Sequence, residues 1–203
     1  MDRLALRGGL GARVVEIKKA TRKKGGYTDH GKRCFFHGCS GFGGCAASEM
    51  PTSTGVDLTR TGFVGKVVPE KFTKIFDIVA SARDAAIEKV RNSFAEGKSL
   101  QGWEIDNVTR EVIVKAGYGE FFCHRTGHSI GKETHGNGAN IDGLETLDTR
   151  KILPGSLFSI EPGIYLEDFG VRSEVNVFVD WDRKVHVTGG QPQQYVVPIL
   201  KDY

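Results

Sequence analysis

Five ionisable residues in otherwise apolar, glycine-punctuated sequence constrain this chain more than any other feature. They are His124, His128, His135, Glu161 and Glu174. A charge in an apolar segment is costly to bury unless it is paired or bound to a metal. Histidine and glutamate are both common metal ligands. A single buried histidine is more often an ordinary core residue, but this grouping favours a polar site that holds a metal.

The two glutamates lie in segments with strand-like patterns. Residues 157–164 form a short apolar run with a Pro-Gly pair, which predicts a buried strand that leads into a turn. Glu161 within this run must meet a cation or strong donors, unless it caps the end of a helix or strand. Residues 171–179 predict a strand with valines on one face and with Arg172 and Glu174 on the other. Taken alone, that second face is best explained as a solvated surface with an ion pair.

The histidine segment is predicted to be a loop. His124 and His128 are four residues apart and could share a helix face, but Gly127 and Gly131 favour a loop or a bulged strand. Residues 142–149 are polar and predict a second loop.

Two helices are predicted in the middle of the chain. Apolar residues recur at every third or fourth position over residues 72–90, which predicts a helix that starts at Pro69 and stops before Gly97. A second helix is expected over residues 104–115, with Gly117 as its stop. The residues expected inside this second helix are Val108, Val112 and Ile113.

The order of elements predicts an α+β fold. Further strands are expected at residues 153–160 and 194–200, after the two helices. Strands, helices and more strands suit a domain in which helices cover one face of a curved antiparallel sheet. The ligand-bearing strands would then line the other face. A hydrophobic content of 39% and a charged content of 26% are typical of globular domains.

Residues 1–50 differ from the rest and are assigned as a separate basic, glycine-rich segment before a domain over residues 51–203. Ten Lys or Arg against three Asp or Glu give residues 1–33 a charge of +7, which leaves −4 on residues 34–203. We expect residues 1–50 to be poorly ordered because they bury too little apolar surface to offset chain entropy. A short strand or helix at residues 12–20 is the exception.

Two other interpretations of this segment are weaker. A basic arm that binds nucleic acid is disfavoured, because interleaved aromatic residues and a recognisable module are missing. A small zinc site is disfavoured because the spacing of its candidate ligands matches no established motif, so that free thiols are preferred. Those candidates are His30, Cys34, His37, Cys39 and Cys45.

The compartment is predicted from what the sequence lacks. No apolar run is long enough to span a membrane, and residues 1–15 lack the apolar centre of a signal peptide. The four cysteines show no framework spacing that would indicate secretion. We therefore expect a cytoplasmic protein without a membrane partner.

Four motifs occur in an order that resembles one family of metal-dependent hydrolases. They are Val-Asp-Leu-Thr-Arg-Thr at 56–61, Gly-His-Ser-Ile-Gly at 127–131, Ile-Glu-Pro-Gly at 160–163 and Arg-Ser-Glu at 172–174. The family includes methionine aminopeptidase, prolidase, aminopeptidase P and creatinase, and its fold is the pita-bread fold. The likeness covers about residues 55–190. The Arg-Ser-Glu form is more similar to the prolidase and aminopeptidase P branch.

The resemblance implies a site for two divalent ions. By resemblance, Asp57 and Glu174 bridge the two ions, and His128 and Glu161 complete the shell of one of them. Glu161 is also the implied proton carrier for the attacking water. Carboxylate-rich ligation with one histidine suits manganese, cobalt, zinc or iron.

The same resemblance gives roles to three further residues and an activity to the chain. His124 and His135 would contact the substrate or the oxyanion rather than a metal. Arg172 would lie behind the ligands and orient Glu174. The implied activity is that of an Xaa-Pro dipeptidase or aminopeptidase, which hydrolyses the N-terminal peptide bond of short peptides through a metal-activated water. A homodimer is left open.

The chain departs from the family at one expected ligand. A further aspartate should lie about a dozen residues before Asp57, where residues 45–50 supply only Glu49 as a carboxylate. The first repeat of the fold is therefore interpreted as incomplete, through divergence, truncation or a reading-frame error. We expect one ion to bind tightly and the second weakly. The alternatives are an impaired relative that serves as a peptide-binding or interaction module, and a creatinase-like hydrolase of a C–N bond.

Overall fold

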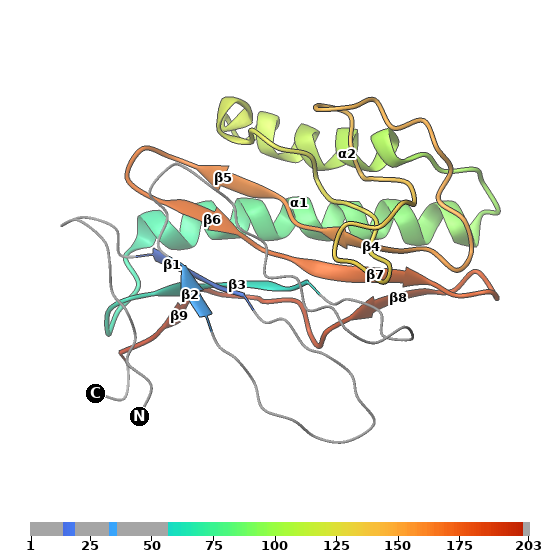
Figure 1. Ribbon diagram of the computed structural model, residues 1–203. Coiled ribbons are helices and arrows are strands. Elements are labelled where there is room, and N and C mark those ends of the chain that lie inside the picture. Colours follow the sequence, from blue (N-terminus) through green and yellow to red (C-terminus); the bar gives the residue numbers. More distant parts are fainter. Residues whose placement is uncertain (1–13, 19–32, 36–56, 201–203) are drawn as a thin grey trace, which may run out of the picture.

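The computed structural model describes residues 57–200 with their side chains, and residues 14–18 and 33–35 as backbone strands (Figure 1). Helix α1 spans Glu70–Ala95, helix α2 spans Gly102–Lys115, and the short 3-10 helix η1 spans Gly119–Phe121. In this part of the chain, no helix combines the length and the apolar character needed to cross a membrane.

The described strands form three sheets. Their bounds are β1 Val14–Lys18, β2 Arg33–Phe35, β3 Thr59–Phe63, β4 Leu157–Ile160, β5 Gly163–Tyr165, β6 Gly170–Arg172, β7 Val175–Val179, β8 Val185–Thr188 and β9 Val197–Pro198. The strand orders are β2-β1-β3-β9, β4-β7-β8 and β5-β6. The described pairings are antiparallel except for the parallel pair of β3 and β9.

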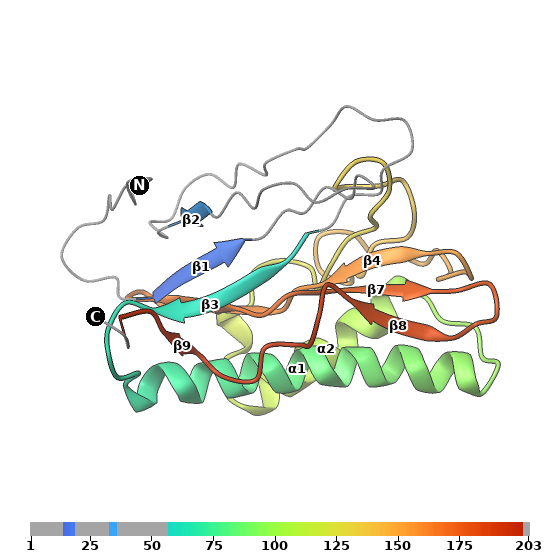
Figure 2. The same cartoon turned by 90° about the horizontal axis from the view of Figure 1, so that it is seen from below.

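Both α-helices lie on the same side of the strands, as Figure 2 shows. The expected α+β arrangement, with helices over one face of mainly antiparallel strands, is therefore confirmed. Two apolar clusters fill the space between helix α1 and the strands. One contains Phe76 together with Ile164 of β5, and the other contains Val90 together with Val177 of β7.

Helix α1 agrees with its predicted apolar stripe. Every residue of that stripe is buried, from Phe72 through Val79 to Val90. The helix begins after Pro69, whose φ of −66° and ψ of 146° place it just outside the first turn. Gly97 follows the end of the helix with a φ of +69°, a left-handed conformation that glycine adopts without steric cost.

The predicted inner face of helix α2 is only partly correct. Ile113 is buried as expected, but Val108 and Val112 are only half-buried. The positions that face inward are also polar, since Asp106 and Thr109 are fully buried. Apolar periodicity cannot identify such a face, because these buried polar side chains are stabilised by hydrogen bonds rather than by apolar contact.

The strand predicted over residues 171–179 is interrupted. Strand β6 ends at Arg172 and β7 begins at Val175, so that Ser173 and Glu174 lie between two strands with different partners. The predicted solvated face is also wrong, because Arg172 is 5% exposed and Glu174 is fully buried.

The strand predicted over residues 157–164 is interrupted in a similar way, with Glu161 between β4 and β5. The earlier residues 153–156 form a turn in which Gly155 has a φ of +85°, which is why β4 starts only at Leu157. The last strand is limited to β9. The two predicted loops, at the histidines and at residues 142–149, contain no strand or helix.

The segment before residue 57 is described only at β1 and β2. Strand β1 lies within the predicted short element at residues 12–20. Strand β1 pairs with β3 in antiparallel orientation, although the two strands are far apart in the sequence. In this register, Lys18 lies opposite Thr59. The other predictions for residues 1–50, namely poor order, free thiols, the zinc and nucleic-acid alternatives and Glu49, lie outside the described residues. The predicted domain boundary at residue 51 also lies outside the described residues and stays a prediction.

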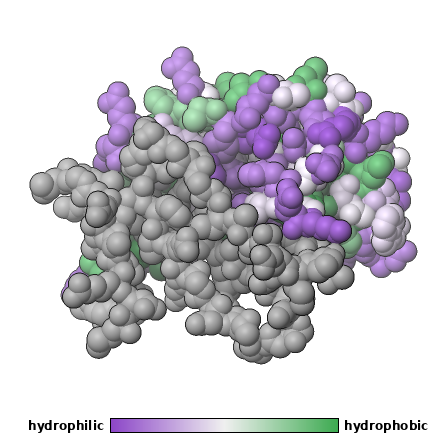
Figure 3. Space-filling view, in the orientation of Figure 1, coloured by the Kyte–Doolittle hydropathy of each residue, from purple (hydrophilic) through white to green (hydrophobic). Residues whose placement is uncertain are grey.

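The described surface on the face of Figure 3 is mainly hydrophilic, with hydrophobic side chains in separate patches. Individual apolar residues are nevertheless well exposed, such as Trp181 at 81% and Val67 at 78%. Scattered exposed apolar side chains are normal on a folded domain, and none of these needs a special explanation.

Candidate metal centre

The histidine loop is held against the end of β4 by backbone hydrogen bonds. The N–H of Ser159 donates to the carbonyl of His128 at 2.9 Å, and the N–H of Glu161 donates to the carbonyl of Thr126 at 2.7 Å. Gly127 exchanges hydrogen bonds with Ile141 on the other side of the loop. These bonds bring the loop beside Glu161.

Gly127 is required by this close approach. A Cβ atom at this position would lie 1.9 Å from the carbonyl oxygen of Ser159 and 2.7 Å from its carbonyl carbon. Real Cβ atoms do not come this close to backbone, so only glycine allows the loop to pack here.

A buried carboxylate on helix α2 fixes the start of the loop. Asp106 accepts hydrogen bonds from the N–H and hydroxyl of Thr126, at 2.9 and 2.6 Å, and from the N–H of Gly143 at 3.0 Å. It also forms a salt bridge with Arg110, at 2.6 Å. Arg110 in turn donates to the carbonyl oxygens of Phe122 and His124. The second turn of α2 therefore positions the loop, a role that sequence reasoning did not assign to Asp106.

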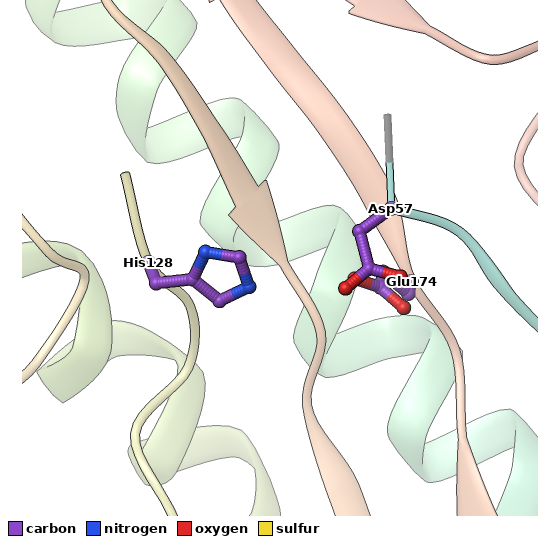
Figure 4. A group of neighbouring side chains, drawn as sticks. All are labelled: Asp57, His128 and Glu174. Carbon is purple, nitrogen blue, oxygen red and sulfur yellow. The ribbon is translucent and has the colours of Figure 1, made fainter. Parts of the chain in front are cut away.

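Asp57, His128 and Glu174 form a cluster of metal-ligand type. Each offers one ligand atom, and these three atoms lie within 4.8 Å of one another. Figure 4 shows the imidazole of His128 facing the carboxylates of Asp57 and Glu174. The residues come from the segment just before β3, the histidine loop and the interruption between β6 and β7, so that only the fold brings them together.

The donor set fits a divalent cation. Ligand atoms about 2.1 Å from one ion lie about 3 to 4 Å apart, so the cluster needs only a small inward shift. The Nδ1 atom of His128 lies 3.1 Å from the carbonyl oxygen of Ser129, and a carbonyl can only accept. When Nδ1 donates its proton to that carbonyl, the lone pair of the neutral ring is on Nε2, as a metal ligand requires.

Glu161 lies beside this cluster rather than within it. Its Oε1 atom is 3.3 Å from Nε2 of His128 and accepts a hydrogen bond from the hydroxyl of Ser159 at 3.1 Å. Its Oε2 atom accepts from Nη1 of Arg172 at 3.0 Å. Both carboxylate oxygens are thus held in place at the edge of the cluster.

The guanidinium of Arg172 is engaged with residues around Glu161. Besides that salt bridge, Nε donates to the hydroxyl of Tyr165 at 2.7 Å, and Nη2 lies 3.3 Å from Nε2 of His124. The predicted orientation of Glu174 by Arg172 therefore stays a prediction. One donor to Glu174 is Thr59, whose hydroxyl lies 2.5 Å from Oε2.

His124 is part of the same network. Its Nδ1 atom donates to the carbonyl of Arg125 at 2.7 Å, which leaves Nε2 to accept from Tyr165 at 3.0 Å. Burial, and secondarily the charge of Arg172, lower the pKa of His124 to about 4. The imidazole is therefore neutral at pH 7 and serves as a hydrogen-bond acceptor.

His135 takes a different position. Its side chain is exposed, and its ring centroid lies 4.3 Å from that of His128. A molecule bound at the cluster would therefore meet His135 from the solvent side. Contacts of His124 and His135 with a substrate stay predictions.

The family relationship follows from the match of residues 52–180, well over half of the chain, to the model of metallopeptidase family M24. The chain belongs to this family. The pita-bread fold expected from the motifs is confirmed by the M24 structures that it resembles. A dipeptidase from Pyrococcus horikoshii superposes with a TM-score of 0.60 at 33% identity, over 72% of this chain and 38% of that chain. The X-Pro aminopeptidase from Thermotoga maritima has a TM-score of 0.60 at 29% identity, over 71% and 38%.

Sequence relatives point to the same branch of the M24 family. The chain is 40% identical over 119 residues to an Xaa-Pro dipeptidase from Lactobacillus helveticus. This match covers 58% of this chain and 29% of that protein. It is 34% identical over 124 residues to the Xaa-Pro dipeptidase from Pyrococcus furiosus, over 61% and 32%. The chain thus matches about a third of the length of these M24 relatives.

Sequence reasoning missed three residues beside the cluster of Asp57, His128 and Glu174, namely Thr59, Ser159 and Tyr165. Thr59 carried a signal, because it lies two positions after Asp57 at a strand start and such residues share a face. Ser159 carried the same kind of signal, because it lies two positions before Glu161. Tyr165 carried none, since its partners His124 and Arg172 are 41 and 7 residues away. Among the residues whose side chains are described, no second cluster of three metal-ligand atoms accompanies the one at Asp57.

Proposed function

We propose that this chain carries the catalytic site of a metal-dependent peptidase that hydrolyses the N-terminal peptide bond of short peptides, preferring proline in second position. The observation that carries the proposal is the cluster of Asp57, His128 and Glu174, with ligand atoms within 4.8 Å of one another. The names of the relatives, Xaa-Pro dipeptidase and X-Pro aminopeptidase, support the substrate class. A cytoplasmic location is part of the same proposal.

Asp57, His128 and Glu174 would hold a divalent ion, with Glu161 within reach beside His128. Manganese, cobalt, zinc and iron all suit such ligands. The ion would supply Lewis-acid activation of water and of the scissile carbonyl.

Glu161 is the proposed proton carrier. A general base must lie within hydrogen-bond reach of the proton that it removes, and Glu161 lies 3.3 Å from the ligand atom of His128. Ser159 and Arg172 each hold one of its oxygens, so the carboxylate is oriented before a substrate arrives. It would take a proton from water and deliver it to the leaving amine.

The proposed roles of the two other histidines differ. His135 is exposed beside His128, and we assign it to contact with the substrate or its oxyanion. Both ring nitrogens of His124 are already bonded within the protein. We therefore infer that His124 acts mainly by holding Tyr165 and Arg172 in place, and meets the substrate only if this network opens.

An impaired relative that binds peptides is the second candidate. Two closely spaced divalent ions repel each other and need several carboxylates to hold them. The described side chains offer one such cluster. A site for one ion would favour weaker hydrolysis than two ions support.

The substrate preference is tested with a panel of dipeptides and creatine. We expect Xaa-Pro dipeptides to be cleaved with a kcat/KM about tenfold or more above that of Met-Ala. Release of free amino acids by protein loaded with Mn²⁺ is the measurement. Faster cleavage of Met-Ala would contradict the preference, and turnover of creatine alone would favour a C–N hydrolase. Binding of Xaa-Pro peptides without cleavage would favour the impaired relative.

The number of bound ions is tested by calorimetric titration of Mn²⁺ into metal-free protein. We expect one tight equivalent, because Asp57 and Glu174 cannot both screen the repulsion between two ions and fill the shell of the second. Mass spectrometry under native conditions provides an independent count. Two tight equivalents would show that a residue before residue 57 completes a second site.

A further inference from the structure

Arg83 is a fully buried cation in the mainly apolar inner face of helix α1. Its Nη1 atom donates to the hydroxyl of Ser173 at 2.6 Å and to the carbonyl of Gln193 at 2.8 Å. Its Nε atom donates to the carboxylate of Asp84 at 2.8 Å, and that side chain is 52% exposed. A buried guanidinium is costly unless its partners are well placed, so these contacts indicate a specific task.

The first partner, Ser173, lies between Arg172 and Glu174 in the interruption between β6 and β7. Regular ladder hydrogen bonds are weak here, since the N–H groups of Ser173 and Glu174 reach the carbonyls of Pro162 and Thr59 only at 3.3 Å. Ser173 is 1% exposed, and its hydroxyl receives the much shorter bond from Arg83. Arg83 therefore adds, from the helix side, a short hydrogen bond to a segment whose own N–H bonds at Ser173 and Glu174 are long.

The second partner, Gln193, connects Arg83 to β3. The side chain of Gln193 accepts from the N–H of Thr61 at 2.8 Å and donates to its carbonyl at 2.6 Å. The hydroxyl of Thr61 in turn donates to the carbonyl of Arg172 at 2.7 Å. This buried polar layer joins β3, which follows Asp57, to the segment that carries Glu174.

We propose that Arg83 is a positioning residue of the metal centre. It holds Ser173 and the backbone of Gln193, and thereby fixes the separation of Asp57 and Glu174, which come from different segments. Removing it leaves the ligands present but their relative position less well defined, so that metal affinity falls. This inference depends on the proposed function only in that the cluster binds a divalent cation.

The test is the affinity of metal-free protein for Co²⁺. It is measured by calorimetry and by the visible absorption of the bound ion. The variants are Arg83→Met, Ser173→Ala and the combination of both. Arg91→Met is the matched control, because it removes an arginine from the same helix. The guanidinium of Arg91 forms an exposed salt bridge with Glu88 at 2.7 Å. We expect each single substitution to weaken Co²⁺ binding about tenfold, as loss of a group behind the ligands does. Arg91→Met binds as the parent protein does.

The double variant separates positioning from general stability. If Arg83 acts through Ser173, the double variant loses about tenfold and not about a hundredfold, because the second change removes a contact already lost. A loss of Co²⁺ affinity of about a hundredfold in the double variant overturns the proposal. A lower Tm in Arg83→Met with unchanged Co²⁺ affinity overturns it as well. Should Arg83→Met fail to fold, Ser173→Ala decides: an unchanged affinity overturns the proposal and a tenfold loss supports it.

Hydrolysis of an Xaa-Pro dipeptide by the parent protein is measured in parallel. Co²⁺ binding without hydrolysis removes the proposed function and leaves the role of Arg83 standing. Hydrolysis together with normal Co²⁺ binding by Ser173→Ala keeps the function and removes the role of Arg83. A parent protein that binds no Co²⁺ overturns both.

Discussion

The His128→Ala substitution is expected to abolish tight binding of a divalent ion and, with it, hydrolysis. His128 offers the nitrogen atom of the cluster, and its Nδ1 atom lies 3.1 Å from the carbonyl oxygen of Ser129. Alanine leaves no lone pair in its place. Asp57 and Glu174 would then be the two remaining members of the cluster that could bind the ion. The loss of affinity should exceed the roughly 10- to 100-fold that residues behind a metal shell contribute.

His135→Ala is the matched control for this experiment. Its exposed ring lies 4.3 Å from the ring of His128, so the two changes remove the same group from neighbouring places. We expect His135→Ala to bind Mn²⁺ as the parent protein does and to lose only turnover. Calorimetry and dipeptide hydrolysis are measured on both variants. Unchanged Mn²⁺ affinity in His128→Ala would mean that the cluster is not the binding site.

The Gly127→Ala substitution is expected to destabilise the domain by about 3 kcal/mol or more, the upper range for overpacking. The new methyl group would lie 1.9 Å from the carbonyl oxygen of Ser159. Neither side can move freely, because Gly127 is bonded to Ile141 and the neighbouring N–H of Ser159 to His128. Urea unfolding of the metal-free protein measures the loss. Any folded fraction should also bind Mn²⁺ more weakly, because His128 follows directly.

Gly131→Ala provides the control within the same loop. A Cβ atom at Gly131 would meet Gly136 at 3.7 Å, an ordinary van der Waals distance. We expect its stability to change far less than that of Gly127→Ala, because no backbone atom must move. Equal destabilisation by the two substitutions would show that loop entropy, and not the clash with Ser159, sets the cost.

Local pattern was sufficient for several elements of the fold. Helix α1 follows directly from an apolar repeat whose members are all buried, with Pro69 and Gly97 at its ends. The glycines around His128 correctly favoured a loop over a helix. Such features depend on neighbouring residues, so a single sequence contains the information needed to predict them.

The same reasoning was wrong where polar groups are buried. The pattern at residues 171–179 predicted a continuous strand with one solvent-exposed face. In the structure the strand is interrupted at Ser173, and both Arg172 and Glu174 are buried. Asp106 on α2 is buried for a similar reason, since its partners Thr126 and Gly143 lie in distant loops. Periodicity records apolar burial, and it cannot reveal a polar group whose cost is offset by remote partners.

By itself, the sequence determined which chemical groups are available: histidines and glutamates in apolar surroundings, set among glycines that prevent a helix. Only the tertiary structure decided which of them meet. Asp57, His128 and Glu174 converge from three separate segments, Glu161 stays beside them, and Arg83 crosses from the helix layer to hold Ser173. Ligand geometry is set by distances between segments remote in sequence, and those distances are fixed only when the helices pack on the strands.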